Sequence, residues 1–279
     1  MKQPFLILII GLLLSTILIA GCTEETEQIT IKINGSTTVF PIIQRCAEQF
    51  NENQETITVI VETPAVGSGG GISLLGEQSI DIACASRPVK SSEENSYEPI
   101  DFHPTVIAYD GVAVIVHHDL YNQGLTALTK EQLKGIYNGS IPNWNEINSG
   151  INASIQVHQR ELGSGTRDTF MDAIFEGDGE VTETALSWSS NPDLKTAVEN
   201  DNSSIGYVGL GFVDENTPSL ALDTVVPSEE TIKDKSYLIN RALFLYTDGE
   251  PTESIKTFID YVKTDAGQTI VENNGFIKI

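Results

Sequence analysis

Apolar and polar residues follow two different periods along this chain, which predicts a protein built from both strands and helices. Residues 29–33 (ITIKI) alternate with a period of two, as in a strand with one buried face. Residues 39–53 (VFPIIQRCAEQFNEN) instead repeat apolar positions every three or four residues. Ile43, Ala47 and Phe50 then share one stripe of an amphipathic helix.

The same two patterns recur along the rest of the chain. The predicted strands are residues 57–63, 80–86, two strand-like runs around Asp110-Gly111 within 105–118, 154–160, 204–213 and 241–247. The predicted helices are residues 71–78, 129–139 capped by Thr129, 166–176, one after Asn191-Pro192 within 185–201, and a pair within 251–274. Strands that alternate with helices predict an α/β fold with mostly parallel sheets. No proline- or serine-rich linker divides the chain, so we expect any two domains to be joined by ordered strands.

The first 22 residues have the pattern of a secretory signal. A lysine at position 2 precedes an apolar run over 5–20, which is shorter than the roughly 20 residues that a membrane span needs. The run ends in IAGC, which resembles a lipobox, so we expect a signal peptide at 1–21 and lipidation of Cys22. An uncleaved N-terminal anchor is the alternative. The lipoprotein and the uncleaved anchor both place the protein outside the cytoplasm at a membrane. The polar, acidic residues 22–28 are expected to be a tether.

The charge, the cysteines and the histidines argue against nucleic-acid binding and against a metal site. The chain has 16 Lys and Arg against 39 Asp and Glu, a formal charge of -23, which argues against nucleic-acid binding. Cys46 and Cys84 lie in apolar surroundings and are expected to be buried thiols; a disulfide is the alternative. The four histidines show no metal-ligand spacing, so no metal or cofactor is expected, and His117-His118 is interpreted as surface polarity.

Three strand-to-helix junctions are rich in glycine and hydroxyl residues: 33–40 (INGSTTVF), 65–73 (AVGSGGGIS) and 160–170 (RELGSGTRDTF). In α/β proteins, ligands bind where strands end and helices begin. The first N–H groups of a helix lack intrahelical partners, and the helix dipole is positive at that end. Three such junctions in one chain predict that they converge on one small oxyanion.

Arginines at strand ends are candidates to bind the same anion. Arg160 and Arg87 each end a predicted strand, and a planar guanidinium suits a tetrahedral oxyanion. Arg167 lies within a predicted helix and is expected to pair with Asp168 or Asp172. The chain contains neither a G-x-x-x-x-G-K-[ST] loop nor a G-x-S-x-G elbow, which argues against a nucleotide site and a serine hydrolase.

Seven segments occur in the order found in the phosphate-binding lipoprotein of the ABC-type phosphate transporter, and the resemblance spans residues 29–279. They are NGSTTVFP, GSGGGI, DIACASRPV, YDGVAVIV, IYNGSIPNWNEI, RELGSGTRDTF and GYVGLGFV. The resemblance implies a two-lobed periplasmic-binding-protein fold of type II, each lobe with a mostly parallel sheet. It implies an oxyanion in the cleft and a hinge of two crossing strands. We expect one lobe from 29–114 with 241–279 and the other from 115–240.

The same resemblance implies a set of binding residues. It places at the helix starts, as ligands of the anion, Thr37, Thr38, Ser68, Gly69, Arg160, Ser164, Gly165 and Thr166. Two departures stand out. Some members have an acid where this chain has Arg87, and some have an acid that orients the arginine where this chain has Leu162; Glu161 is placed to do so instead.

A carboxylate that accepts the proton of hydrogen phosphate would favour phosphate over sulfate, which has no proton to donate. Asp110 is the candidate for this acceptor; a simple turn at Asp110-Gly111 is the alternative.

The expected function is therefore capture of inorganic phosphate outside the cytoplasm and its delivery to a membrane permease, by a monomer that performs no chemistry. The alternatives are another tetrahedral oxyanion such as sulfate or molybdate, a cell-surface phosphate-ester hydrolase, and an adhesin or sensor with an occluded cleft.

Overall fold

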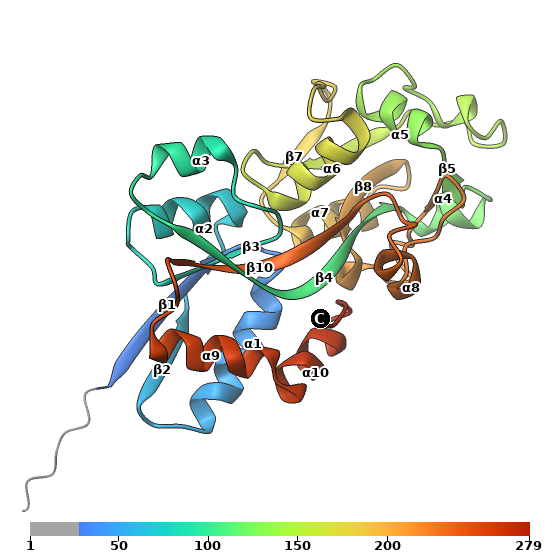
Figure 1. The fold of residues 1–279 in the computed structure, drawn as a ribbon. Helices are drawn as coiled ribbons and strands as arrows, with labels where there is room; N and C mark the ends of the chain where they lie inside the picture. Colours follow the sequence, from blue (N-terminus) through green and yellow to red (C-terminus); the bar gives the residue numbers. More distant parts are fainter. Residues whose placement is uncertain (1–27) are drawn as a thin grey trace, which may run out of the picture.

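The computed structural model of the protein describes residues 28–279 (Figure 1). The predicted signal peptide at 1–21, the predicted lipidation of Cys22 and the tether up to residue 27 lie outside this range and stay predictions. Within residues 28–279, none of the helices combines the length and apolar character needed to span a bilayer.

The strands form one large mixed sheet and one small sheet. The large sheet has the order β2-β1-β3-β10-β4-β8-β6-β7, and β5 and β9 form the small one. The pairs at both ends of the large sheet are parallel, whereas β10 and β4 run antiparallel to their neighbours in the middle. The strands are β1 (Ile29–Gly35), β2 (Ile57–Val61), β3 (Ile82–Ala85), β4 (Phe102–Val116), β5 (Ala127–Leu128), β6 (Gln156–Arg160), β7 (Leu186–Trp188), β8 (Ser204–Gly209), β9 (Ala221–Leu222) and β10 (Asn240–Asp248).

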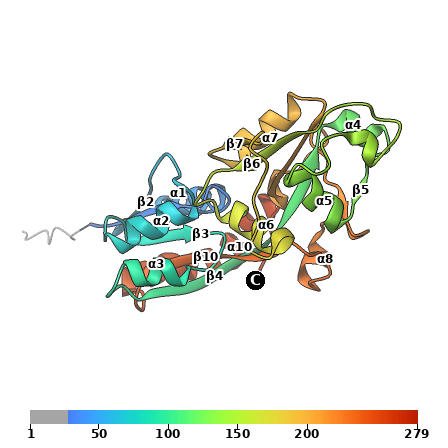
Figure 2. The same cartoon turned by 90° about the horizontal axis from the view of Figure 1, so that it is seen from above.

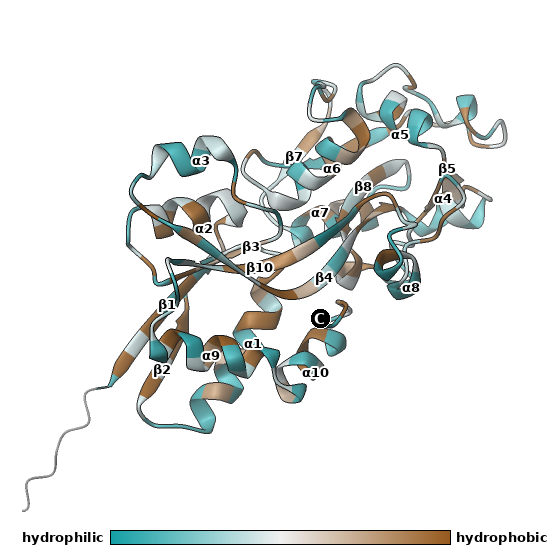
Figure 3. Cartoon of the chain, in the orientation of Figure 1, coloured by the Kyte–Doolittle hydropathy of each residue, from teal (hydrophilic) through white to brown (hydrophobic). Residues whose placement is uncertain are grey.

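Helices follow most strands, and several of them present polar residues at the surface. The helices are α1 (Phe40–Glu52), α2 (Gly67–Gly76), α3 (Ser91–Ser96), α4 (His118–Asn122), α5 (Lys130–Tyr137), α6 (Gly165–Phe175), α7 (Asn191–Glu199), α8 (Glu229–Lys233), α9 (Glu253–Lys263) and α10 (Asp265–Asn273), with 3-10 turns η1 (Trp144–Glu146) and η2 (Leu210–Phe212). Hydrophobic residues concentrate along the central strands, while α3, α5 and α8 are mostly hydrophilic (Figure 3). The predicted cap of α5 is confirmed, because the Thr129 side chain accepts a hydrogen bond from the Gln132 N–H.

The two largest of the four hydrophobic clusters within residues 28–279 meet along β4. One cluster includes Ile43 and Phe258 and takes Ala108 from β4. The other includes Trp144 and takes Val112 from β4. Figure 2 shows β4 running from the region of β1–β3 toward that of α4, α5 and β5. Along β4 the core passes from one cluster to the other between Ala108 and Val112, and the C-terminal segment contributes to both, with Phe276 in the first and Ile277 in the second.

The α/β class predicted from the alternation is correct, but the central strand was predicted wrongly. The segment around Asp110-Gly111 is one strand of 15 residues, and neither a break between two strands nor a turn exists there. Asp110 pairs with Arg241 and Gly111 with Asn240 in the register of β4 and β10. Packing explains the glycine, because a Cβ at Gly111 would lie 2.5 Å from Cδ1 of Ile232.

The two cysteines in the described part of the chain are free and buried, as the apolar sequence context predicted. Burial raises the pKa of each thiol to about 12. Such thiols behave as small core side chains, because the reactive thiolate is strongly disfavoured.

Candidate functional site

Four helix N-termini meet near the middle of β4 and β10. They belong to α1, α2, α6 and α7, which begin at Phe40, Gly67, Gly165 and Asn191. The segment before α1 contacts α6 through the Thr38 and Thr166 hydroxyls, 3.1 Å apart. The α2 end contacts the loop before α6 through a Gly69 N–H that donates to the Gly163 carbonyl at 2.9 Å. Helix starts bring partial positive charge and free N–H groups to this region.

A chain of serine hydroxyls connects these helix starts. Ser36 donates to Ser86 at 3.0 Å, and the Ser68 and Ser86 hydroxyls lie 3.2 Å apart. Gly165 packs directly on this chain, because a Cβ there would lie 2.4 Å from Ser68 Oγ and 2.5 Å from Ser86 Oγ. The cluster therefore combines neutral hydroxyl donors with a close backbone approach that only glycine allows.

A buried ion pair between Arg241 and Asp110 contacts the hydroxyls of the cluster. Arg241 donates through Nε and Nη2 to Oδ2 of Asp110 at 2.9 and 2.7 Å. Its Nη1 also donates to Thr166 Oγ1 at 3.0 Å, and its Nη2 to Thr38 Oγ1 at 3.2 Å. Because one guanidinium holds two hydroxyls from different helix starts, Arg241 sets the position of both.

Both side-chain oxygens of Asp110 already accept hydrogen bonds from protein donors. Its Oδ1 accepts the Leu210 N–H at 3.0 Å, and Oδ2 accepts both contacts from Arg241. Burial raises the pKa of the Asp110 carboxyl and lowers that of the Arg241 guanidinium, and each partner's charge opposes the shift of the other. The geometry thus makes Asp110 a counter-ion that orients Arg241.

Arg160 ends β6 and has one buried nitrogen without a partner. Glu161 binds the guanidinium at 2.9 and 3.2 Å, as its sequence position suggested. The carbonyls of Trp188 and Ser189 accept further bonds from it at 3.0 and 2.9 Å. Nη1 is buried and makes no hydrogen bond within residues 28–279. Unpaired buried donors are costly, so this nitrogen points to a ligand.

Arg87 is held by two carboxylates at the edge of the cluster. It donates to both oxygens of Glu93 at 2.7 Å. Its Nε also lies 2.7 Å from Oδ2 of Asp168 on α6, at ion-pair distance but outside hydrogen-bond direction. Lys90 lies 2.7 Å from the same oxygen. Arg87 thus ties the end of β3 to α6.

The charged groups around the cluster cancel. Four cations (Arg87, Lys90, Arg160, Arg241) face four carboxylates (Glu93, Asp110, Glu161, Asp168) in direct pairs. An anion bound here therefore relies on directed N–H and O–H groups and helix dipoles, and less on net charge. Such binding is compatible with a chain of charge -23.

Most of the predicted site residues lie in or beside this cluster. Thr38, Ser68, Gly165 and Thr166 meet in it, and Gly69 contacts the loop before α6. Ser164 is the N-cap of α6, where its side chain accepts the Arg167 N–H at 3.3 Å. Thr37 lies at the margin, 3.4 Å from Asn191 Nδ2. Arg167 forms no ion pair with Asp168 or Asp172 among the residues described.

Four residues of the cluster were missed. Ser36 lies in INGSTTVF and Ser86 in DIACASRPV. A hydroxyl residue alone does not indicate whether its side chain belongs to an anion site. Asn191 follows Ser189-Ser190 at a helix start, the same pattern as the other junctions, so it was identifiable. Arg241 has no local cue, since its role depends on its pairing with Asp110 in another part of the chain.

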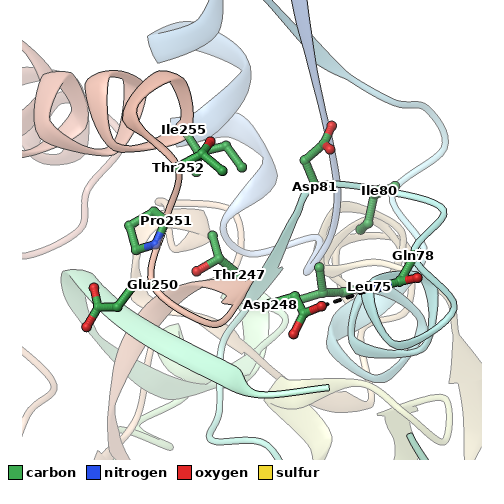
Figure 4. Close-up of a pocket in the computed structure, with 10 residues that line it drawn as sticks. All are labelled: Leu75, Gln78, Ile80, Asp81, Thr247, Asp248, Glu250, Pro251, Thr252 and Ile255. Carbon is green, nitrogen blue, oxygen red and sulfur yellow. Dashed lines mark hydrogen bonds between the residues drawn. The ribbon is translucent and has the colours of Figure 1, made fainter. Parts of the chain in front are cut away.

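Two other features lack the character of an anion site. The cavity of about 180 Å³ in Figure 4 presents Asp81, Asp248 and Glu250 and no basic residue. His117, His118 and Asp119 bring ligand-type atoms within 4.8 Å of one another, but Nδ1 of His117 already accepts the Asp119 N–H at 3.1 Å. His117 is also buried, contrary to the surface interpretation.

A cavity of about 360 Å³ opens directly beside the cluster. Thr37, Ala65, Ser189 and Pro192 are among the residues that line it. These residues belong to the starts of α1 and α7 and to the segment before α2, so the cavity is bounded by three of the four helix starts that form the cluster.

Comparison with known proteins gives a consistent result. Residues 20–266 match the PBP superfamily domain. The phosphate-binding protein PstS of Staphylococcus saprophyticus is 31% identical over 89% of this chain and 80% of its own. The protein of the same name from Borreliella burgdorferi is 29% identical over 98% of both chains.

Solved structures agree with these relatives. A phosphate ABC transporter substrate-binding protein of Clostridium perfringens with bound phosphate has 33% identity and a TM-score of 0.81, over 90% of this chain and 99% of that one. An ABC-type phosphate transport receptor of Vibrio cholerae has 31% identity and a TM-score of 0.73, over 89% and 100%.

Proposed function

The chain belongs to the PstS family of phosphate-binding proteins within the PBP superfamily, and from this premise we propose that it binds inorganic phosphate for an ABC-type transporter. It acts as a binding component and not as an enzyme, like its relatives. The observation that carries the proposal is the meeting of four helix starts around neutral hydroxyls, with the buried, unpartnered Nη1 of Arg160.

We propose that phosphate binds among these donors. The proposed ligands are Thr37, Ser68, Ser164 and Thr166 through their hydroxyls, Gly165 through its N–H group, and Arg160 through Nη1. Thr38 and Gly69, also implied by the resemblance, are engaged within the protein, by Thr166 and Gly163, and are proposed to position the site. Arg87 and Asp110 were expected to touch the anion. Because both are paired with protein groups, we propose that Arg87 ties α6 to the end of β3 and that Asp110 orients Arg241.

We propose two lobes, from 29–114 with 241–279 and from 115–240. The change of core cluster between Ala108 and Val112 supports a boundary within β4, and Ile277 packs with the second cluster. We propose that β4 and β10 are the hinge and that phosphate binding closes the lobes, because donors from both sides must reach one ion. The cavity of about 360 Å³ beside Thr37 is the proposed route to the site.

We further propose that the mature protein is a monomer anchored by lipid on Cys22 to the outer face of the cell membrane, where it delivers phosphate to the permease. A Cys22→Ser variant is then expected in the culture or periplasmic fraction, while the native protein stays with the membrane. Retention of the variant on membranes would favour the uncleaved anchor.

One experiment distinguishes phosphate binding from the two alternatives, which are another oxyanion as ligand and a phosphate-ester hydrolase. Sulfate or molybdate is the alternative ligand. A hydrolase needs a base at its nucleophile, and no histidine hydrogen-bonds to these hydroxyls in the described part of the chain. We would measure thermal unfolding and calorimetry with phosphate, sulfate and molybdate. Phosphate at 100 times its dissociation constant should stabilise the protein by about 2.7 kcal/mol. No response to millimolar phosphate, or turnover of p-nitrophenyl phosphate, would contradict the proposal.

A further inference from the structure

Asn191 is a fully buried polar residue at the centre of the cluster. Its Nδ2 donates to Thr38 Oγ1 at 2.9 Å and lies 3.4 Å from Thr37 Oγ1. Its Oδ1 is buried and accepts no hydrogen bond within residues 28–279. Oδ1 belongs to the amide whose Nδ2 contacts Thr38 and lies near Thr37, a proposed ligand of phosphate. An unused buried acceptor of this kind calls for a donor on the ligand.

The hydrogen count supports this orientation of the amide. Thr38 Oγ1 accepts from Asn191 Nδ2 and from Arg241 Nη2, which fills both of its lone pairs. Its own hydrogen must then go to Thr166 Oγ1 at 3.1 Å. Thr166 also accepts from Arg241 Nη1 at 3.0 Å, so the Thr166 hydrogen is left free to donate. With the amide turned over, Thr38 would donate to Asn191 and Thr166 to Thr38, and neither of these two hydroxyls would keep a hydrogen for an anion.

We propose that Asn191 Oδ1 accepts the hydrogen bond of the P–OH group and so selects hydrogen phosphate against sulfate. This inference rests on the proposed function. Both ionic forms of phosphate near neutral pH carry an O–H, whereas sulfate carries none. Sulfate would leave Oδ1 unpaired against one of its own oxygens, a loss of about tenfold or more in affinity. Asp110 is not the proposed acceptor, because both of its oxygens already accept hydrogen bonds from Arg241 and the Leu210 N–H, whereas Asn191 Oδ1 accepts none within residues 28–279.

Two substitutions with opposite expected effects test the role. Asn191→Leu keeps the approximate shape and removes the acceptor. Asn191→Asp keeps an acceptor, makes it charged and removes the donor to Thr38. Calorimetry would give the dissociation constants of phosphate and sulfate for the full chain, and circular dichroism melts would verify folding. The ratio of the sulfate constant to the phosphate constant should fall at least about tenfold for Asn191→Leu. It should rise at least about tenfold for Asn191→Asp, since a carboxylate repels sulfate more strongly than a neutral oxygen does.

A purely structural role, or an Nδ2 that faces the anion, predicts that both anions lose affinity by the same factor. An unchanged ratio in either variant therefore overturns the inference, and one folded variant is enough to decide. The control is Asn200→Leu and Asn200→Asp, at the exposed C-terminal end of the same helix, where the Asn200 side chain donates to the Thr196 carbonyl. If the native protein fails to bind phosphate at all, the proposed function fails, and not the role of Asn191 alone.

Discussion

Asp110 and Arg241 face each other in register across β4 and β10 and form an ion pair at 2.7 Å in which Asp110 is fully buried. The pair lies where the two hydrophobic clusters separate, and the same guanidinium reaches Thr38 and Thr166. One buried pair thus links the central strands to the hydroxyls of the site.

Removal of the Asp110 charge should destabilise the protein strongly. Asp110→Asn leaves Arg241 buried without a counter-ion, which is expected to cost about 3–5 kcal/mol of unfolding free energy. Urea unfolding of native protein and variant measures the loss. Asp260→Asn breaks the exposed pair with Lys256 on α9 and should cost less than about 0.5 kcal/mol.

The double variant Asp110→Leu with Arg241→Met should recover most of that stability, because no uncompensated charge remains buried. It should still bind phosphate poorly, because Thr38 and Thr166 lose the guanidinium that positions them. A double variant no more stable than Asp110→Asn would show that the ion pair does not account for the loss.

A single methyl group at Gly165 should block the site. The added Cβ would lie 2.4 Å from Ser68 Oγ and 2.5 Å from Ser86 Oγ, so α6 and α2 could not approach as closely. We expect Gly165→Ala to weaken phosphate binding by at least about tenfold in calorimetry, with a near-native melting profile. Gly150→Ala, at an exposed position near the Asn148 side chain, is the control; equal binding by both variants would refute the close contact.

The contact between Arg87 and Asp168 should slow phosphate release. Asp168→Asn removes the carboxylate that ties α6 to Arg87 and Lys90. For a partly buried charge pair, a rise in the release rate of about tenfold or more is expected. Stopped-flow measurement of phosphate release tests this, with Asp172→Asn on the exposed side of α6 as the control. If both variants release phosphate at the native rate, the contact does not hold the closed form.

Stability should fall in alkaline solution. Burial raises the pKa of Cys46 and Cys84 from 9.0 to about 12 and that of Tyr137 above its usual range. The unfolded chain then loses these protons at lower pH than the folded chain. The stabilisation is complete below about pH 9 and decreases as pH rises toward 12, by about 1.4 kcal/mol per pH unit and per group.

Denaturant midpoints measured between pH 8 and 11 test this alkaline decrease. Cys84→Ala should reduce the slope by the share of one group. An identical slope in the variant would mean that the Cys84 thiol ionises equally in both states.

The sequence by itself determined the features that depend on neighbouring residues. Alternation of periods established the α/β class, and Thr129 predicted the cap of α5 because capping involves residues three apart. Glycine and hydroxyl residues at helix starts identified three of the four helix N-termini that meet. Glu161 was placed correctly beside Arg160 because the two are adjacent.

Tertiary structure alone decided which distant groups became partners. Arg241 lies 131 residues from Asp110, and only the register of β4 and β10 brings them together. Because of that pairing, we propose that Asp110 is the counter-ion of Arg241 and not, as predicted, a ligand of phosphate. The packing of α6 likewise brings Asp168 to ion-pair distance from Arg87. Local propensity carries no information on such contacts, since they depend on how separate segments close around a common core.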